Sequence, residues 1–360
     1  MSTVDVNQIN FVSGDSGTFA IYNDVYYKIN DSSRAVIEEL QKGSSISVVA
    51  AKFFVSDGEI EKLLEAFHKK KKGSILGRIV LFPKVACNFA GSTLQYLVGN
   101  NKHMLLFVIC YILSCFYMFN YCAPVNSISI FQAFTVFFLI LFWHELGHVA
   151  AAYKCGIRNL QIRLGFYLIF PVTHVDMNAV YTLTNKQRLL IDMAGLYFQM
   201  LLGIIFCVFS LISDNAFWAL AFSENLMVII YNLIPYQISD GHWMYSDYFG
   251  IDNLNSQSKK FAKSFFLFRT EKSGNKYAAS IKVYSIFNAV FVSLLTVYSI
   301  VVLILRSFTF HQIYENLVTS HFAVYEVLKA CWLLYPYCLL LIFFIVKINE
   351  YTKNLVNGKK

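Results

Sequence analysis

Residues 134–153 read FTVFFLILFWHELGHVAAAY, an almost wholly apolar run that contains two histidines and one glutamate. The run predicts a helix that crosses a membrane, because about 20 apolar residues span the hydrocarbon core. Ionisable side chains are costly at that depth and usually serve a function when they occur there. His144, Glu145 and His148 are therefore the first candidates for a functional site.

The composition supports a membrane protein. The 360 residues are 57% hydrophobic and 14% charged, whereas about 25% of the residues of an average soluble domain are charged. The formal charge of +8 would suit a nucleic-acid partner, but the basic residues follow the expected membrane topology, so we expect no nucleic acid. The eight cysteines are scattered without a CxxC pair, which favours buried apolar side chains over disulfides or a zinc cluster.

Six apolar stretches predict an α-helical, multi-pass protein of the cell membrane. They lie at about 103–122, 128–153, 188–212, 216–235, 281–305 and 327–347. Three connectors, at 123–127, 213–215 and 307–326, contain no Lys or Arg, whereas the connectors on the other side are basic. The positive-inside rule therefore predicts that both termini lie in the cytoplasm.

The interval 157–187 is too polar and interrupted for a seventh span. Within it, QIRLGFYLIF alternates between polar and apolar residues, which predicts a strand or a re-entrant hairpin. Irregular backbone at membrane depth requires a protein cover or a wet cavity. Because this re-entrant β-like segment directly follows the histidine-bearing helix, we expect it to form the wall of an active-site cleft.

The N-terminal residues predict a small cytoplasmic α+β domain that is winged-helix-like. TFAIYNDVYYKIN alternates around Asn23-Asp24, as in a β-hairpin. Three short amphipathic helices follow, the third with Ser56 and Glu59 placed as a capping box. The basic run Lys69 to Lys72 favours a solvated cluster or one that faces lipid headgroups. The predicted division is a domain at 1–75, a linker and membrane-surface segment at 76–102, a transmembrane domain at 103–350 and a cytoplasmic tail at 351–360.

The HELGH motif indicates a metal site. His144 and His148 are four residues apart and lie on one helix face, where two imidazoles can bind one Zn²⁺. Glu145 then lies beside the metal and can take a proton from water. The alternative, a structural cluster, would bury three uncompensated polar groups.

Two histidines leave a catalytic zinc site incomplete, because three protein ligands are usual. The stretch NLIPYQISDGHWMYSDYFG, residues 232–250, interrupts a helix and carries Asp240 in a turn-forming Asp-Gly pair. Asp240 is the preferred third ligand and His242 its main rival, while His174 and Asp176 are further candidates.

HExxH within a span, followed about ninety residues later by NxxPxxxxDG, resembles the site-2 metalloprotease family of intramembrane peptidases. The resemblance implies that Asp240 is the third ligand and that His242 is not. The family's Gly-Pro-x-x-Asn element is altered here, with Leu196 for proline and Gln199 for asparagine. Gln199 and Asn232 are candidates for substrate or oxyanion contacts. Ser239 stands where the family usually has leucine.

Residues 140–255 are similar to the peptide zinc metalloproteases of that family, and the first seventy-odd residues resemble the leader-binding domain of ribosomal peptide maturation systems. These resemblances imply a zinc endopeptidase that cuts a small ribosomally made precursor, with Glu145 as general base. Its partners would include membrane lipid, peptide-modifying enzymes and an exporter. Zn²⁺ would polarise the scissile carbonyl and lower the pKa of bound water to about 7.

Three alternatives remain open at this stage. The substrate could be a membrane-anchored regulator instead of a small peptide. The histidines and Glu145 could serve as a proton or metal-ion relay in a peptide transporter, since such groups are common in pumps. The chain could also be an inactive receptor or immunity protein that binds peptide without cutting it, although the intact HExxH motif disfavours this.

Overall fold

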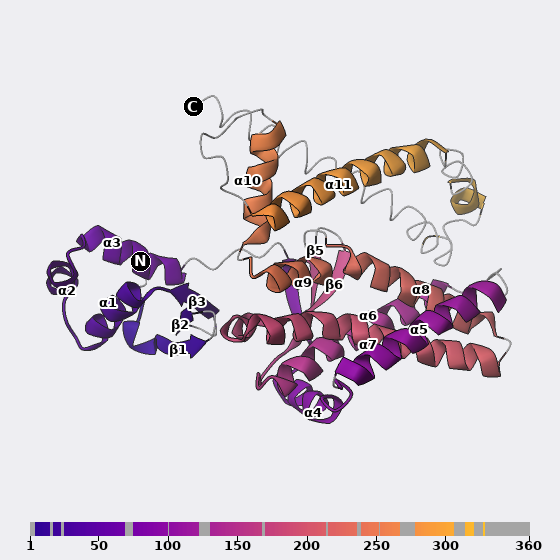
Figure 1. Ribbon diagram of the computed structural model, residues 1–360, viewed down its shortest axis with the longest axis horizontal. Coiled ribbons are helices and arrows are strands. Elements are labelled where there is room, and N and C mark those ends of the chain that lie inside the picture. The colour runs from indigo at the N-terminus through magenta and orange to yellow at the C-terminus, as the bar shows by residue number, and fades with distance from the viewer. Residues whose placement is uncertain are drawn as a thin grey trace.

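The computed structural model describes residues 4–14, 17–22, 25–68, 75–99, 101–121, 130–167, 170–213, 215–235, 239–251, 253–266, 278–305, 314–319 and 327. It is mostly helical, with two small sheets (Figure 1). Within these residues, four helices are long and apolar enough to cross a membrane. They are α5 (Asn101–Tyr121), α6 (Ile130–Lys154), α7 (Asn185–Ile212) and α8 (Ala216–Leu233).

These four helices match the first four predicted spans. Thr184 and Gln187 form a capping box that starts α7, and Asn215 caps α8. The predicted fifth span, 281–305, lies within the 27-residue helix α11 (Ala279–Leu305). The predicted sixth span, 327–347, lies outside the described residues except for residue 327, as does the tail at 351–360.

Helices α6 and α7 pack closely, and small residues make this possible. A Cβ on Gly147 would lie 2.4 Å from the Ala194 carbonyl oxygen, so only glycine fits there. Trp143 donates from its indole nitrogen to the Phe198 carbonyl at 2.9 Å, a second link between the helices. The glycine of HELGH is therefore needed for helix packing.

The expected re-entrant hairpin is present as strands β5 (Ile162–Tyr167) and β6 (Phe170–Val175), followed by the short helix η2 (Asn178–Thr182). A third strand, β4 (Ile75–Phe82), pairs with β5 on the other side. Residues 76–102, expected as a linker and membrane-surface segment, thus contain most of β4 and helix α4 (Lys84–Leu94). Among the described strands, β6 lies at one edge of this sheet.

The N-terminal unit contains η1 (Val6–Gln8), β1 (Asn10–Gly14), β2 (Gly17–Tyr22), β3 (Val25–Ile29), α1 (Asp31–Gln41), α2 (Ile46–Phe53) and α3 (Asp57–His68). The β2–β3 hairpin and three helices agree with the prediction, and the Glu59 carboxylate accepts the Ser56 amide hydrogen at 2.9 Å. Strand β1 was not expected. The unit has its own cores, for example around Ile37 and Val49. Residues 69–72 lie outside the described part.

The sheet of the N-terminal unit lies against the segment that follows β6. Both outer strands, β1 and β3, contact η2. A Cβ on Gly14 would come within 2.3 Å of the Thr182 carbonyl oxygen, so the two backbones meet directly. The N-terminal unit is therefore placed beside the start of α7 (Figure 1).

Two short helices follow α8. Helix α9 (Asp240–Phe249) begins just after Pro235 and the residues 236–238 that are not described, and it packs on α7. Helix α10 (Leu254–Phe266) packs on α11. The interruption after α8 places the first residue of α9 beside the histidines of α6.

Candidate active site

His144 and His148 lie in the last three turns of α6 and are buried. Their Nε2 atoms are 3.0 Å apart, and the His148 Nδ1 lies 2.8 Å from the Ile191 carbonyl oxygen of α7. That carbonyl can only accept, so the proton of a neutral His148 is on Nδ1 and its Nε2 lone pair faces His144. The ring is therefore oriented as a metal ligand requires.

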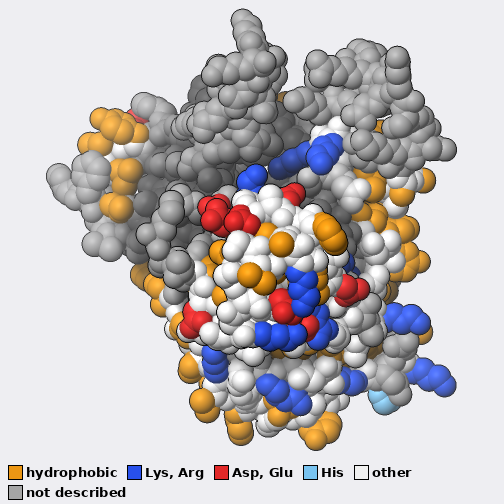
Figure 2. Space-filling view, turned by 90° about the vertical axis from the view of Figure 1, so that its left-hand side faces the viewer, with side chains coloured by type: hydrophobic (Ala, Val, Ile, Leu, Met, Phe, Trp, Pro, Cys, Tyr) orange, Lys and Arg blue, Asp and Glu red, His pale blue; other side chains and the backbone are white. Residues whose placement is uncertain are grey.

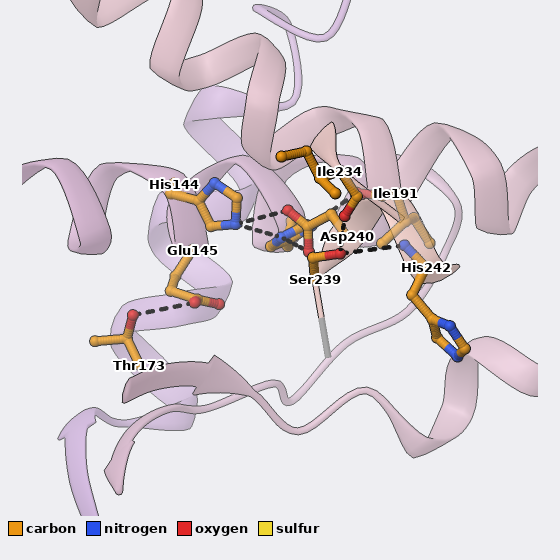
Figure 3. A network of polar contacts seen from close by, with 9 residues as sticks. His144, Glu145, Thr173, Ile191, Ile234, Ser239, Asp240 and His242 are labelled. Atoms are coloured by element: carbon orange, nitrogen blue, oxygen red, sulfur yellow. Dashed lines mark hydrogen bonds and ion pairs between the residues drawn. The ribbon is translucent and has the colours of Figure 1, made fainter. Parts of the chain in front are cut away.

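Asp240 enters the same space from the first position of α9 (Figure 3). Its Oδ2 lies 2.9 Å from His144 Nε2, and its Oδ1 lies 3.6 Å from His148 Nε2. Ser239 caps the helix: its hydroxyl donates to the Ile234 carbonyl and accepts from the His242 amide. Serine at this position thus fixes the backbone next to Asp240, which the leucine usual in the family could not do.

These three side chains fit a zinc ion. They form a His-His-Asp group whose ligand atoms all lie within 4.8 Å of one another. Zinc bonds of 2.0–2.1 Å in tetrahedral geometry place ligand atoms about 3.3 Å apart, and the separations here are 2.9, 3.0 and 3.6 Å. Two imidazoles and a carboxylate are also donors that zinc accepts. We propose these three residues as the metal ligands.

The electrostatics favour an ionised Asp240. Burial alone would raise the pKa of its carboxyl group, but His144 and His148 outweigh burial and hold that pKa below its usual range. A carboxylate that stays ionised among buried groups is prepared to bind a cation.

Glu145 adjoins the histidines and is 6% exposed. Its Oε1 accepts a hydrogen bond from the Thr173 hydroxyl of β6 at 3.1 Å (Figure 3). It is not a member of the His-His-Asp group. The arrangement leaves Glu145 available for proton transfer, with one oxygen oriented by the sheet.

Gly195 of α7 lies directly against the two imidazoles. A Cβ at this position would come within 2.5 Å of His144 Cε1 and 2.6 Å of His148 Nε2. Any larger residue would displace the rings, so this glycine is required by the site.

The rival ligands lie elsewhere. His242 points away from His144 and Asp240 (Figure 3), and its Nδ1 is 2.6 Å from the hydroxyl of Tyr284 on α11. Burial lowers the pKa of His242 to about 4, so the ring is neutral. Asp176 lies 3.7 Å from Arg163 in an ion pair. Neither these residues nor His174 belong to the metal-binding group found among the described residues.

Gln199 and Asn232, the two candidates for substrate or oxyanion contacts, are not members of the His-His-Asp group. Gln199 lies one helical turn beyond Gly195 and is fully buried, and neither polar atom of its side chain has a hydrogen-bond partner within the described part of the chain. Asn232 is half-buried in the last turn of α8. Their roles stay predictions.

Sequence reasoning missed Thr173 and the carbonyl of Ile191. Thr173 lies 28 residues from Glu145, and a threonine in an alternating strand carries no sign of its partner. A backbone carbonyl leaves no trace in the sequence at all. Both contacts could be found only from the packing of β6 and α7 against α6.

Comparison with known proteins supports the chemistry of the site. Residues 132–215 match peptidase family M50. A curated Bacillus subtilis (strain 168) protein named "Putative peptide zinc metalloprotease protein YydH" is 26% identical over 140 residues, which cover 35% of this chain and 54% of that protein. The match thus spans about half the length of the relative, and no solved structure matches the chain.

The segment matched by the family contains His144, Glu145, His148 and Gly195, the residues that build the site on α6 and α7. The donor set and the family both indicate Zn²⁺ as the metal. The part of the chain that holds both histidines is thus similar to peptidase family M50, the family of the site-2 metalloproteases.

Proposed function

We propose that the chain is an intramembrane zinc endopeptidase. The observation that carries the proposal is the convergence of His144, His148 and Asp240 within 4.8 Å, with Glu145 beside them on a membrane-spanning helix. A structural cluster would not need a carboxylate delivered from a separate helix. A relay for transport would not need one either.

The residues divide the chemistry between them. His144, His148 and Asp240 would hold Zn²⁺, which supplies Lewis-acid polarisation of the scissile carbonyl and acidifies water. Glu145 takes a proton from the attacking water at its carboxylate and passes it to the leaving amine. The Thr173 hydroxyl holds Glu145 Oε1 and so directs the carboxylate during both transfers.

Strand β6 can position the substrate. It carries Thr173 and lies at the edge of its sheet among the described strands. An extended peptide could pair with this edge through main-chain hydrogen bonds, which would bring its amide beside Glu145. A helical substrate would need to unwind first, because a helix buries its own amides.

One experiment tests the activity. Zinc content and peptide cleavage are measured on the same purified, detergent-solubilised sample, with a chelated sample as control. We expect zinc to be bound and cleavage to be lost on chelation and restored by added zinc. Bound zinc without cleavage of any peptide would favour a receptor, and an absence of zinc would disprove the metal centre.

We further propose that the substrate is a small ribosomally made peptide precursor. The N-terminal unit has its own core and carries charges of both signs on the face shown in Figure 2, as a solvated domain does. A solvated domain of this kind could recruit a soluble peptide precursor. The contact of the unit with η2 places it near β6. The name of the Bacillus subtilis relative also contains the words "peptide zinc metalloprotease". A membrane-anchored regulator is the alternative substrate.

Deletion of residues 1–75 tests the role of this unit. If it is a winged-helix-like module that recruits the precursor, tethering raises the precursor's effective concentration to the millimolar range. The deletion should then slow cleavage of dilute full-length precursor but hardly affect a short peptide that spans only the scissile bond. Zinc content should not change. Equal slowing of both substrates would show that the unit supports the fold instead.

The proposed location is the cell membrane, with six spans and both termini in the cytoplasm. The four described spans and the basic connectors support this arrangement. Cysteine-reactive labels on intact and permeabilised cells, applied to single cysteines at positions 2 and 358 of a cysteine-free variant, should react only after permeabilisation. Labelling of position 358 but not of position 2 in intact cells would mean an odd number of spans, and labelling of both would mean the opposite orientation.

A further inference from the structure

A buried group of charged residues joins α9 to α7 away from the metal ligands. Arg188 of α7 donates to Asp247 of α9 at 3.0 Å, and their side chains are only 5% and 12% exposed. The same guanidinium nitrogen donates to Asn185 at 2.8 Å. Asp192, also buried, lies against Asp247. None of these side chains takes part in the proposed chemistry.

The spacing of this group relates it to the site. Asp247 lies two helical turns after Asp240 on α9, and Arg188 lies two turns before Gly195 on α7. Gly195 touches both histidines, and Asp240 meets the same histidines from the other side. The two helices therefore run antiparallel, with the metal site at one end of their contact and the Arg188–Asp247 pair at the other, about 10 Å away.

Helix α9 needs such an anchor. It has only 10 residues, and a helix this short is marginal unless tertiary contacts hold it. Its N-terminal end is fixed by the Ser239 cap and by the close approach of Gly241 to the Leu233 carbonyl. The rotation of the helix about its axis depends on contacts further along. A shift at Asp247 would turn Asp240 away from the histidines.

We propose that Arg188 and Asp247 act as positioning residues that hold α9 in the orientation that presents Asp240 to the metal. We call this pair the α7–α9 clamp. An ion pair is suited to this role because its geometry is directional, and because a buried charge without its partner is strongly disfavoured. The inference rests on the proposed function only in taking zinc as the bound metal.

The test measures zinc affinity of the full-length protein in detergent by competition with a chromophoric chelator. Asp247→Asn keeps the shape of the side chain and removes its charge, so we expect roughly tenfold to hundredfold weaker zinc binding, as for loss of an outer partner of a metal ligand. Circular dichroism should show unchanged helix content. Arg188→Lys, which retains the charge but has a shorter side chain and no planar guanidinium to fix the direction of its hydrogen bonds, should weaken binding less.

Tyr245→Phe is the matched control. It removes the hydrogen bond from the Tyr245 hydroxyl to the Ser280 carbonyl and thus a contact of the same helix with the segment that starts α11. Its zinc affinity should stay within about twofold of the unmodified protein, since the clamp remains. Equal weakening in this control would show that any loosening of α9 has the same effect, and the clamp would be wrong.

The remaining outcomes also decide the matter. A folded Asp247→Asn protein with unchanged affinity overturns the clamp. If that variant loses its helix content, Arg188→Lys decides: weaker zinc binding with the fold retained supports the clamp, and unchanged binding overturns it. A protein that binds zinc as expected but cuts no peptide would refute the proposed activity and leave the clamp standing.

Discussion

The Glu145→Gln protein is expected to bind zinc normally and to lose peptide cleavage by about 10²–10⁴-fold, the usual contribution of a general base. The amide has the shape of the carboxylate and can still accept the hydrogen bond from Thr173, so the packing of β6 on α6 should persist. It cannot take a proton from water. The loss should therefore fall on kcat, with little change in KM.

Glu224→Gln provides a matched control. Glu224 lies in α8, which is long and apolar enough to cross a membrane. It is partly buried and belongs to no metal-binding group found in the described part of the chain. The same glutamate-to-glutamine substitution in another of the long apolar helices should leave cleavage within a few fold of the unmodified protein. Cleavage by Glu145→Gln at near-normal rates, with zinc retained, would refute the general-base role. Loss of cleavage in both variants would indicate a general effect of replacing a carboxyl group in these helices.

The parts of the fold that could be predicted are those with a local signal. Helices α5 to α8 carry continuous apolar runs, and the hairpin of β2 and β3 carries an alternating pattern around Asn23-Asp24. Strand β4 carries an apolar run as well, but its partner β5 lies some eighty residues further along the chain. Such long-range pairing leaves no local signal, so the segment looked like a linker at the membrane surface.

The candidate site divides in the same way. The spacing of His144 and His148 on one helix is local and indicates a metal without further information. Asp240 lies about ninety residues after His148, and the interrupted helix end before it made it the preferred third ligand without excluding His242. The structure distinguishes Asp240 from its rival His242, because the orientation of α9 turns the imidazole of His242 toward Tyr284. No sequence pattern predicts which way a ten-residue helix faces when packing decides it.

The burial of charged residues was the feature that the sequence indicated least. Arg188 and Asp247 are 59 positions apart in sequence, and in isolation each resembles an ordinary solvated residue next to the membrane. The side chains of Arg188 and Asp247 are only 5% and 12% exposed, and a buried charge without a partner is strongly unfavourable. Their burial therefore indicates that the two residues must pair. Gly147 and Gly195 are similar cases, because in the sequence each is only a part of a motif. The structure shows that a Cβ on Gly147 would collide with the backbone of α7 and that a Cβ on Gly195 would collide with the two imidazoles.

Asp240→Ala should remove or greatly loosen the metal, because two histidines alone cannot complete a catalytic zinc site. The loss of affinity should exceed the roughly 10–100-fold that removal of an outer partner costs. The helix should still form, since its cap is Ser239 rather than Asp240. Cleavage should disappear together with zinc, and circular dichroism should show the fold retained.

His242→Ala tests the ligand assignment from the other side. This substitution removes the contact with Tyr284, at 2.6 Å, and leaves the three proposed ligands in place. Some thermal stability should be lost, because a buried hydrogen bond and ring contact with α11 disappear. Zinc measured by atomic emission should stay at the level of the unmodified protein. If His242→Ala alone lost its zinc while Asp240→Ala kept it, His242 would be the third ligand. Helix α9 would then have to turn by nearly half a revolution to present it, since each residue advances about 100° around a helix and the two positions differ by two residues.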